Sequence, residues 1–304
     1  MDMKIENASL NNGSTNSLKD AWADHSRQFD KYHWVYPVIS RRAGGISLGI
    51  NLNIDTICNF DCVYCQVDRT VAPPQPTHND VEKIAEELSH ALAHWRHNKF
   101  QDAPRFQNID PSFLELKDFC FSGDGEPTSA PEFAEMVDLL VQIKNQENLN
   151  YLKIVVITNA TLLHRPAVQK ALATMAANRG EIWAKLDAGT EEYFQRINRS
   201  RYKLDHIETN IINAAQQFPL RIQSMWCAYR NEVPSPAEIE AYAQRVLRIE
   251  AAAHQAGHKL LEIQLYSVVR RTTEAEVQAL DQEFLLNIKE ALMQFGIKTS
   301  VEIY

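Results

Sequence analysis

Three cysteines, Cys58, Cys62 and Cys65, stand close together in the sequence with the spacing C-x3-C-x2-C. This spacing places three thiolates on one short loop, where each can ligate a different iron of a cubane iron–sulfur cluster. The fourth iron then lacks a nearby cysteine and keeps a coordination position for a substrate or cofactor. The motif therefore predicts a [4Fe–4S] cluster that takes part in chemistry.

Two alternatives compete for the same three cysteines. A zinc site usually takes two well-separated ligand pairs, and His33 and His78 do not lie at zinc-finger spacing from the triplet. An electron-transferring cluster normally shows a fourth cysteine. Cys120 and Cys227 are isolated within predicted strands, and we expect them to be small buried hydrophobic residues. One cluster is therefore expected.

The composition is ordinary for a soluble globular protein. The chain has 304 residues, of which 45% are hydrophobic and 23% charged. We see neither an apolar run of roughly 18–20 residues nor a signal peptide. An odd, clustered cysteine set indicates a reducing cytoplasm. The net charge of −8 argues against nonspecific binding along a nucleic-acid backbone but leaves room for a local basic site.

Apolar runs rich in β-branched residues alternate with longer runs at helical spacing. The predicted strands are 47–54, 116–121, 152–157, 182–186, 220–228, 260–266 and 300–303. The predicted helices are 80–97, 131–144, 165–177, 191–197, 204–218, 236–255 and 274–295. Six consecutive βα units predict an α/β fold, a partial (βα)6 TIM-like barrel, with the working site at the carboxyl ends of its strands.

Polar residues follow several of these strands. The run Ser122–Thr128 (SGDGEPT) follows the second, and its glycines allow the backbone to approach a ligand closely. Lys185 and Asp187 are two residues apart at the end of the fourth strand, so they share one face. Charged residues at the end of an otherwise apolar barrel strand indicate a function.

The cysteine motif after a first strand, with aromatic Tyr64 before the last cysteine, resembles the signature of the radical S-adenosylmethionine (SAM) superfamily. The resemblance implies a partial barrel in which the three cysteines bind the [4Fe–4S] cluster. It also implies that the amine and carboxylate of SAM chelate the fourth iron and that Tyr64 lies beside the adenine.

The later loops extend this resemblance. Gly123, Asp124, Gly125 and Glu126 are similar to a Gly-Gly-Glu-like motif that binds the SAM amino group, although Asp124 departs from its commonest form. Thr158 and Asn159 begin a segment similar to the family's T-N-G-T. By resemblance, Lys185 and Asp187 contact the SAM carboxylate and ribose, or the substrate.

Three segments, 36–42, 185–199 and 264–274, resemble one subgroup that includes the wyosine-base synthases, which rebuild a tRNA guanine, and many bacterial relatives. We expect the radical SAM core to span 33–275. A flexible arm, 1–32, would precede it, and 276–304 would complete the domain with a helix and a short strand. Wyosine synthases carry additional N-terminal cysteines, whereas none precedes Cys58 here, so a tRNA substrate stays an alternative.

Seven arginines fall in loops that the barrel scheme places at the cysteine mouth. Surface loops often carry arginine, but guanidinium groups also bind phosphate and carboxylate, so we hypothesise an anionic substrate. The candidates for that contact are Arg69, Arg199, Arg270 and Arg271, and the others are Arg196, Arg201 and Arg230.

The resemblance implies an enzyme that reductively cleaves SAM and abstracts hydrogen from an unidentified, small or nucleotide-like anionic substrate. Its electrons would come from a reducing partner such as flavodoxin or ferredoxin, and no membrane partner is expected. The alternative of another class is a non-catalytic iron–sulfur redox or sensor protein. Glu126, Lys185 and Asp187 argue against it, because a relay needs no SAM site.

Overall fold

The computed structural model describes residues 18, 21–22, 29–73 and 75–304. Most of the predicted N-terminal arm, 1–32, lies outside the described residues. Within them, nine strands form the sheet in the order β1-β2-β3-β4-β5-β6-β7-β9, and β8 pairs with β6. The strands are β1 (Val35–Ser40), β2 (Gly45–Ile50), β3 (Leu116–Phe121), β4 (Lys153–Thr158), β5 (Gly180–Lys185), β6 (Leu220–Tyr229), β7 (Glu262–Ser267), β8 (Val277–Ala279) and β9 (Val301–Ile303).

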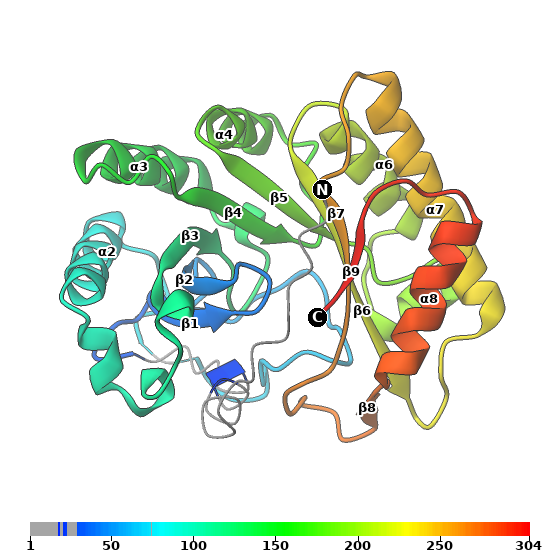
Figure 1. Ribbon diagram of the computed structural model, residues 1–304, viewed down its shortest axis with the longest axis horizontal. Helices are drawn as coiled ribbons and strands as arrows, with labels where there is room; N and C mark the ends of the chain where they lie inside the picture. The colour runs from blue at the N-terminus through cyan, green and yellow to red at the C-terminus, as the bar shows by residue number, and fades with distance from the viewer. Residues whose placement is uncertain (1–17, 19–20, 23–28, 74) are drawn as a thin grey trace, which may run out of the picture.

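Helices cover the convex face of this curled sheet, as Figure 1 shows. Strands β2 to β7 and β9 run parallel, and helical connections return the chain between them. The helices are α2 (Val81–Arg96), α3 (Phe133–Gln146), α4 (Pro166–Ala177), α5 (Glu191–Ile197), α6 (Leu204–Ala215), α7 (Pro236–Gln255) and α8 (Gln282–Gln294). The arrangement is the predicted partial barrel, and that prediction is confirmed.

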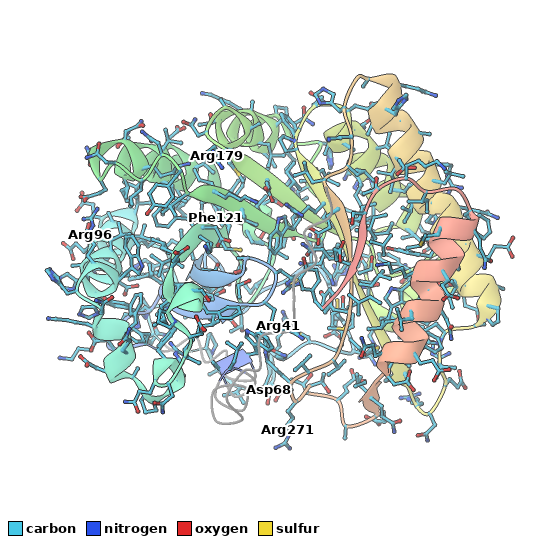
Figure 2. The ribbon with its side chains drawn as sticks, in the orientation of Figure 1. Arg41, Asp68, Arg96, Phe121, Arg179 and Arg271 are labelled. Atoms are coloured by element: carbon cyan, nitrogen blue, oxygen red, sulfur yellow. The ribbon has the colours of Figure 1, made fainter. Side chains whose placement is uncertain are left out.

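Successive residues of a strand point to opposite faces of the sheet, and the two faces differ in polarity. Outward residues such as Phe119, Ile154 and Ile222 belong to the main hydrophobic core with the helices. Phe121 packs edge-on against Phe133 of α3 at 5.1 Å between ring centroids, and Figure 2 labels it between sheet and helix. Inward residues alternate with these and are largely polar. The parallel strands thus bury one apolar face and turn the other toward the barrel interior.

The structure corrects the sequence predictions in two regions. β1 was missed; it pairs antiparallel with β2 and adds an edge strand before the repeat. The predicted helix 274–295 is wrong in its first turns, where β8 pairs antiparallel with β6 instead. Helix α8 begins at Gln282 because the Asp281 side chain accepts a hydrogen bond from the Phe284 amide at 2.8 Å.

The last short strand, β9, joins the repeat. It pairs parallel to β7, with Ile263 opposite Val301, and extends the sheet at its far edge. Between α2 and β3 the chain forms three short 3₁₀ helices: η1 (Lys99–Asp102), η2 (Pro104–Phe106) and η3 (Pro111–Leu114). Over the part of the chain that the structure describes, the helices are too short or too polar to cross a lipid bilayer.

Candidate functional site

The cysteine loop leaves the carboxyl end of β2 and lies across the barrel mouth. Figure 1 draws it in light blue near the orange segment before β8, and the Thr273 amide donates to the Cys65 carbonyl at 3.0 Å. Cys58, Cys62 and Cys65 are all partly buried. The segment before β8 therefore lies against the cysteine loop at Cys65.

Each thiol sulfur accepts at least one N–H hydrogen bond. The Phe60 amide donates to Cys58 Sγ at 3.5 Å, and Asn198 Nδ2 donates to Cys62 Sγ at 3.4 Å. Cys65 Sγ accepts from the Val67 amide at 3.5 Å and from Arg69 at 3.1 Å. Such donors stabilise negative charge on sulfur, which a metal-bound thiolate carries.

Burial favours the neutral form of two of the free thiols, those of Cys58 and Cys62. It raises the pKa of Cys58 to about 11, and burial together with the Asp187 carboxylate raises the pKa of Cys62 to about 12. Among the described residues, no three His, Cys, Asp or Glu side chains could hold a single metal ion. A cubane cluster does not need three ligands around one metal ion, because each thiolate ligates a different iron.

A buried polar network lies behind Cys62. Asp187, at the end of β5, accepts hydrogen bonds from the Tyr64 hydroxyl, from Asn198 Nδ2 at 3.0 Å and from the Met225 amide at 2.8 Å. It also pairs with Lys185 at 2.8 Å. This network joins the cysteine loop to β5, β6 and the end of α5, and brings together three of the predicted SAM residues.

Lys185 is held as a cation within that network. Burial alone lowers its pKa, but Asp187 and the Tyr266 hydroxyl outweigh burial, so the pKa of Lys185 lies above its ordinary value. Its Nζ donates to Tyr266 Oη at 2.5 Å and to Asp187, which leaves one of three ammonium protons for another acceptor. An anionic ligand group at the mouth would meet that proton.

The glycines after β3 allow two loops to lie close together. A side chain at Gly123, whose φ is +155°, would overlap Asn51, and one at Gly125 would overlap the Ile57 carbonyl. The Asp124 side chain accepts from Asn51 Nδ2, and its amide donates to Asn51 Oδ1 at 3.1 Å. The loop that was predicted to approach a ligand thus lies directly against the cysteine loop.

Glu126 is buried and accepts four hydrogen bonds within the protein. Its donors are the Thr128 amide and hydroxyl at 3.2 and 2.5 Å, the Thr158 hydroxyl at 2.6 Å and the Asn159 amide at 2.7 Å. Asn159 Nδ2 in turn donates to Asn59 of the cysteine loop at 2.5 Å. Glu126, Thr158 and Asn159 therefore form a frame that connects the loops after β2, β3 and β4.

Several rim arginines have protein partners. Arg199 makes two hydrogen bonds to the Glu274 carboxylate, at 2.5 and 2.9 Å, and Arg196 pairs with Glu232 at 2.6 Å. Arg69 binds Cys65 Sγ and the Asp124 carbonyl. Arg271 projects from the lower edge of the molecule in Figure 2 and is exposed. Arg270 contacts Gln66 at 3.2 Å. Their role toward a substrate stays a prediction.

A cavity of about 220 Å³ lies on the inner face of the sheet below the mouth. Its wall includes Asp118, buried and accepting a hydrogen bond from Ser47 Oγ at 2.5 Å. Burial raises the pKa of Asp118 to about 6, although Ser47, Lys153 and Arg42 lower it. Between about pH 4 and 6 the Asp118 carboxyl is therefore protonated in the native protein and ionised in the unfolded chain.

Asp118→Asn is expected to stabilise the protein at neutral pH. The contribution of Asp118 to the free energy of unfolding is fully present below about pH 4. It is lost as pH rises through about 6, because the ionised carboxylate is then buried. Removing the charge should raise the free energy of unfolding by about 2 kcal/mol at pH 7.5 and little at pH 4. Urea unfolding at both pH values measures this, and equal effects at the two would contradict it.

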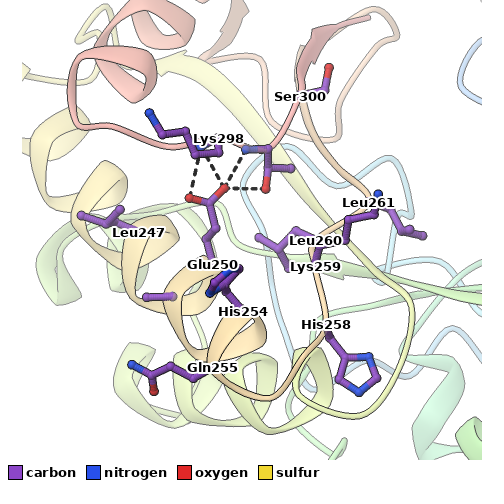
Figure 3. Close-up of a pocket in the computed structure, with 12 residues that line it drawn as sticks. Leu247, Glu250, His254, Gln255, His258, Lys259, Leu260, Leu261, Lys298 and Ser300 are labelled. Carbon is purple, nitrogen blue, oxygen red and sulfur yellow. Dashed lines mark hydrogen bonds between the residues drawn. The ribbon is translucent and has the colours of Figure 1, made fainter.

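A second hollow, of about 680 Å³, lies beside the end of α7 and the start of β9, as Figure 3 shows. Its Glu250 carboxylate accepts from the Lys298 amide at 3.0 Å and from the Thr299 amide and hydroxyl at 2.6 Å. Parallel strands begin at this end of the barrel, away from the cysteine loop. The hollow is larger than the inner cavity but is remote from the thiols.

Sequence reasoning missed several residues of the site. Asn51, Asn59 and Asn198 connect the loops through their amide side chains, and Arg42 and Tyr266 line the barrel interior. Isolated asparagines carry no periodic signal. Arg42 and Tyr266 lie in the segments 36–42 and 264–274 that carried the family resemblance, but β1 was not predicted and no role was assigned to either side chain.

No family model matches the chain. A UPF0026 protein of Synechocystis is 29% identical over 204 residues, 63% of this chain and 63% of that protein. A UPF0026 protein of Methanocaldococcus jannaschii is 29% identical over 168 residues, 54% and 43% of the two chains. A protein named GTPase Obg from Brachyspira hyodysenteriae is 25% identical over 269 residues, 88% of this chain. The chain spans between 34% and 63% of the length of these relatives.

Solved structures of radical SAM proteins share the fold. A radical SAM methyltransferase from Sphaerobacter thermophilus has a TM-score of 0.59 at 14% identity, covering 91% of this chain and 71% of that one. SuiB of Streptococcus suis bound to SAM has 0.54 at 11%, covering 87% and 52%. TYW1 with a bound lysine-pyruvate adduct has 0.51 at 17%, covering 83% and 74%. The predicted resemblance is therefore confirmed: the chain shares its fold with radical SAM enzymes and is similar in sequence to UPF0026 proteins.

Proposed function

We propose that this protein is a radical SAM enzyme, which reductively cleaves SAM at one [4Fe–4S] cluster and abstracts hydrogen from an anionic substrate. The observation that carries the proposal is the set of three partly buried thiols at the barrel mouth, each supplied with an N–H donor. A purely structural cysteine needs no such donors. The fold shared with radical SAM enzymes supports the same reading.

Cys58, Cys62 and Cys65 would hold the cluster. When bound, the cluster and SAM supply one-electron reduction of the sulfonium and the radical that removes hydrogen from the substrate. Within the described residues, Cys120 is buried in β3, and Cys227 is buried in β6, where it packs as a small apolar residue against Val63 of the cysteine loop. The chain therefore offers three thiols to the cluster, and the open iron position falls to SAM.

The surrounding residues would position SAM rather than react with it. Tyr64 is fixed by its hydrogen bond to Asp187, and the Lys185 ammonium has one proton free for an anionic group. Gly123, Asp124, Gly125, Glu126, Thr158 and Asn159 would form the SAM side of the pocket. The side chains of Glu126 and Asn159 fix the loops, so the SAM contacts from this side would come from the backbone.

The SuiB structure is bound to SAM, and one SuiB structure holds a precursor peptide. The SAM-bound structure supports SAM as the cofactor here, whereas the peptide is a ligand of SuiB and identifies no substrate for this chain. A wyosine-like reaction on tRNA is the second candidate, because TYW1 covers 83% of this chain. Despite burial, Asp187 and the Tyr266 hydroxyl raise the pKa of Lys185, so they favour the protonated ammonium over the nucleophilic free amine.

Anaerobic reduction tests the proposed function. The reconstituted protein with dithionite and SAM is expected to form 5′-deoxyadenosine and methionine, at a rate above that of the cluster without protein. Flavodoxin or ferredoxin should replace dithionite as the reductant. A protein that assembles the reduced cluster but neither binds nor cleaves SAM would be the non-catalytic redox or sensor protein instead. Chromatography of the quenched reaction gives the result.

A further inference from the structure

The cavity of about 220 Å³ on the inner face of the sheet follows β3 toward the mouth. Asp118, Cys120 and Ser122 alternate along the chain there, so their side chains point to the same face, and all three line the cavity. Four residues of a strand span about 13 Å. The volume is below the roughly 300–1,000 Å³ of drug-sized ligand sites, so the cavity has room for a small molecule. The lining also includes Tyr36, Arg42, Ser47, Ile157, Trp183 and Arg270.

Asp118 lies at the end of this cavity that is farther from the mouth, and only 3% of the residue is exposed. One oxygen of its carboxylate accepts a hydrogen bond from Ser47 Oγ at 2.5 Å. The other oxygen accepts none from the residues that the structure describes, and it is not among the fully enclosed polar atoms that lack a partner. This second oxygen is therefore open to the cavity.

Basic side chains near Asp118 in the sheet bind other carboxylates. Lys153 lies opposite Asp118 in the register of β3 and β4, but its Nζ pairs with Glu181 at 2.6 Å, and Arg221 Nε binds Glu181 at 2.8 Å. Within the described part of the chain Asp118 has no ion pair, and burial raises its pKa to about 6 although Lys153 and Arg42 attract its charge. A buried carboxylate is costly unless its oxygens are paired. The open oxygen therefore indicates a positively charged donor that the protein itself does not supply.

The lining beyond Asp118 is partly apolar and partly basic. Cys120, Ile157 and Trp183 pack together as one apolar cluster, and all three line the cavity. Arg42 and Arg270 bring two guanidinium groups to the same lining, and the guanidinium carbon of Arg42 lies 5.7 Å from the ring centroid of Trp183. These groups would repel a ligand that carried positive charge alone. A ligand that fits therefore carries an ammonium group, an anionic group and an apolar part.

We propose that this inner cavity binds a free α-amino acid with an apolar side chain, whose ammonium group donates to the open oxygen of Asp118. The carboxylate of the amino acid offsets the two guanidinium groups and supplies the anionic group expected of the substrate. Its side chain contacts the apolar cluster of the lining. The cavity also touches Gly123 and Gly125 at the mouth, so the ligand lies beneath the cysteine loop. Naming this amino acid the substrate rests on the proposed function, whereas its binding does not.

The test is calorimetric titration of the reconstituted protein, with and without SAM, at pH 7.5. The probes are L-norleucine, hexanoate, which lacks its amine, and pentylamine, which lacks its carboxylate. L-Norleucine is expected to bind with a Kd of about 1 mM or lower. Hexanoate and pentylamine should each bind at least about 10-fold more weakly, because each lacks one of the two charged groups.

Asp118→Asn should weaken L-norleucine binding about 10- to 100-fold, because it removes the charge that receives the ammonium group. The variant suits this test because the substitution is expected to stabilise the protein at neutral pH. In the wild type, L-norleucine should bind about 10-fold more weakly at pH 5 than at pH 7.5, because the Asp118 carboxyl, with a pKa of about 6, is then largely protonated. Asp118→Asn should lack this pH dependence.

Asp138→Asn is the matched control. Asp138 is exposed on α3, outside the cavity lining, and its loss should leave the affinity for L-norleucine unchanged. Three results would overturn the inference: no binding of L-norleucine, hexanoate or pentylamine bound as tightly as L-norleucine, or equal affinity for L-norleucine in wild type and in correctly folded Asp118→Asn. 5′-Deoxyadenosine formation without probe reports separately on the proposed function, so either proposal can fail alone.

Discussion

Cys62→Ala is expected to abolish assembly of the iron–sulfur cluster and with it the formation of 5′-deoxyadenosine. Cys62 is one of three thiols available to the cluster, and its sulfur accepts a hydrogen bond from Asn198 at 3.4 Å. Removing a residue that only orients a metal ligand costs about 10–100-fold in metal affinity or activity, so loss of a ligand should cost at least about 100-fold. Iron and sulfide content and the electron paramagnetic resonance spectrum after reduction measure the outcome.

Cys227→Ala is the matched control for this prediction. Cys227 is buried in β6 and packs with Val63 and Ile197, where a cysteine acts as a small apolar residue. The variant is expected to retain its iron and its SAM cleavage. If Cys62→Ala held a full cluster, or if both variants lost it equally, the assignment of the three-cysteine loop would be wrong.

The partial barrel followed from the sequence because its signals are local and repeated. Each parallel strand is a short apolar run, each helix shows 3.6-residue periodicity, and the alternation fixes the class of fold. The helix before Gln282 was mispredicted because 274–280 has good helix formers, and its pairing with β6 depends on a contact distant in sequence. Tertiary pairing overrides such propensity.

The cysteine loop and the residues after the strands also followed from their spacing and position. What the sequence could not give is the partner of each polar side chain. Glu126 and Asp187 were expected to face SAM, and in the structure both accept hydrogen bonds from neighbouring loops. Arg199 was expected to contact a substrate; in the structure it donates hydrogen bonds to Glu274, and its role toward a substrate stays a prediction. Whether a charged residue contacts ligand or protein depends on residues far apart in sequence.

The loops at the barrel mouth are connected in the same way on both sides of the cysteine loop, by hydrogen bonds to a buried carboxylate. The frame around Glu126 connects the loops after β2, β3 and β4, and the network around Asp187 connects the cysteine loop to β5 and β6. Two buried carboxylates thus fix both sides of the cysteine loop. A site in which the cluster, SAM and substrate must keep fixed relative positions requires such rigidity.

Glu126→Ala is expected to lower the free energy of unfolding by about 3 kcal/mol or more. The substitution removes the acceptor of four hydrogen bonds and leaves the Asn159 amide and the Thr158 hydroxyl buried without it. Each hydrogen bond to a charged group contributes about 1.5–3 kcal/mol, offset here by the burial that raises the pKa of Glu126. Urea unfolding of the cluster-free protein measures the change.

Glu126→Gln separates this structural role from a direct role in SAM binding. Glutamine keeps one oxygen for the threonine hydroxyls but turns an NH₂ group toward the Asn159 amide, so an intermediate loss of stability is expected. Glu86→Ala on the exposed face of α2 is the control and should change stability by no more than about 0.5 kcal/mol. If both Glu126 variants unfolded like wild type but lost SAM affinity, Glu126 would be a ligand contact. Loss of stability with little change in SAM affinity of the folded fraction would establish it as the link between the loops.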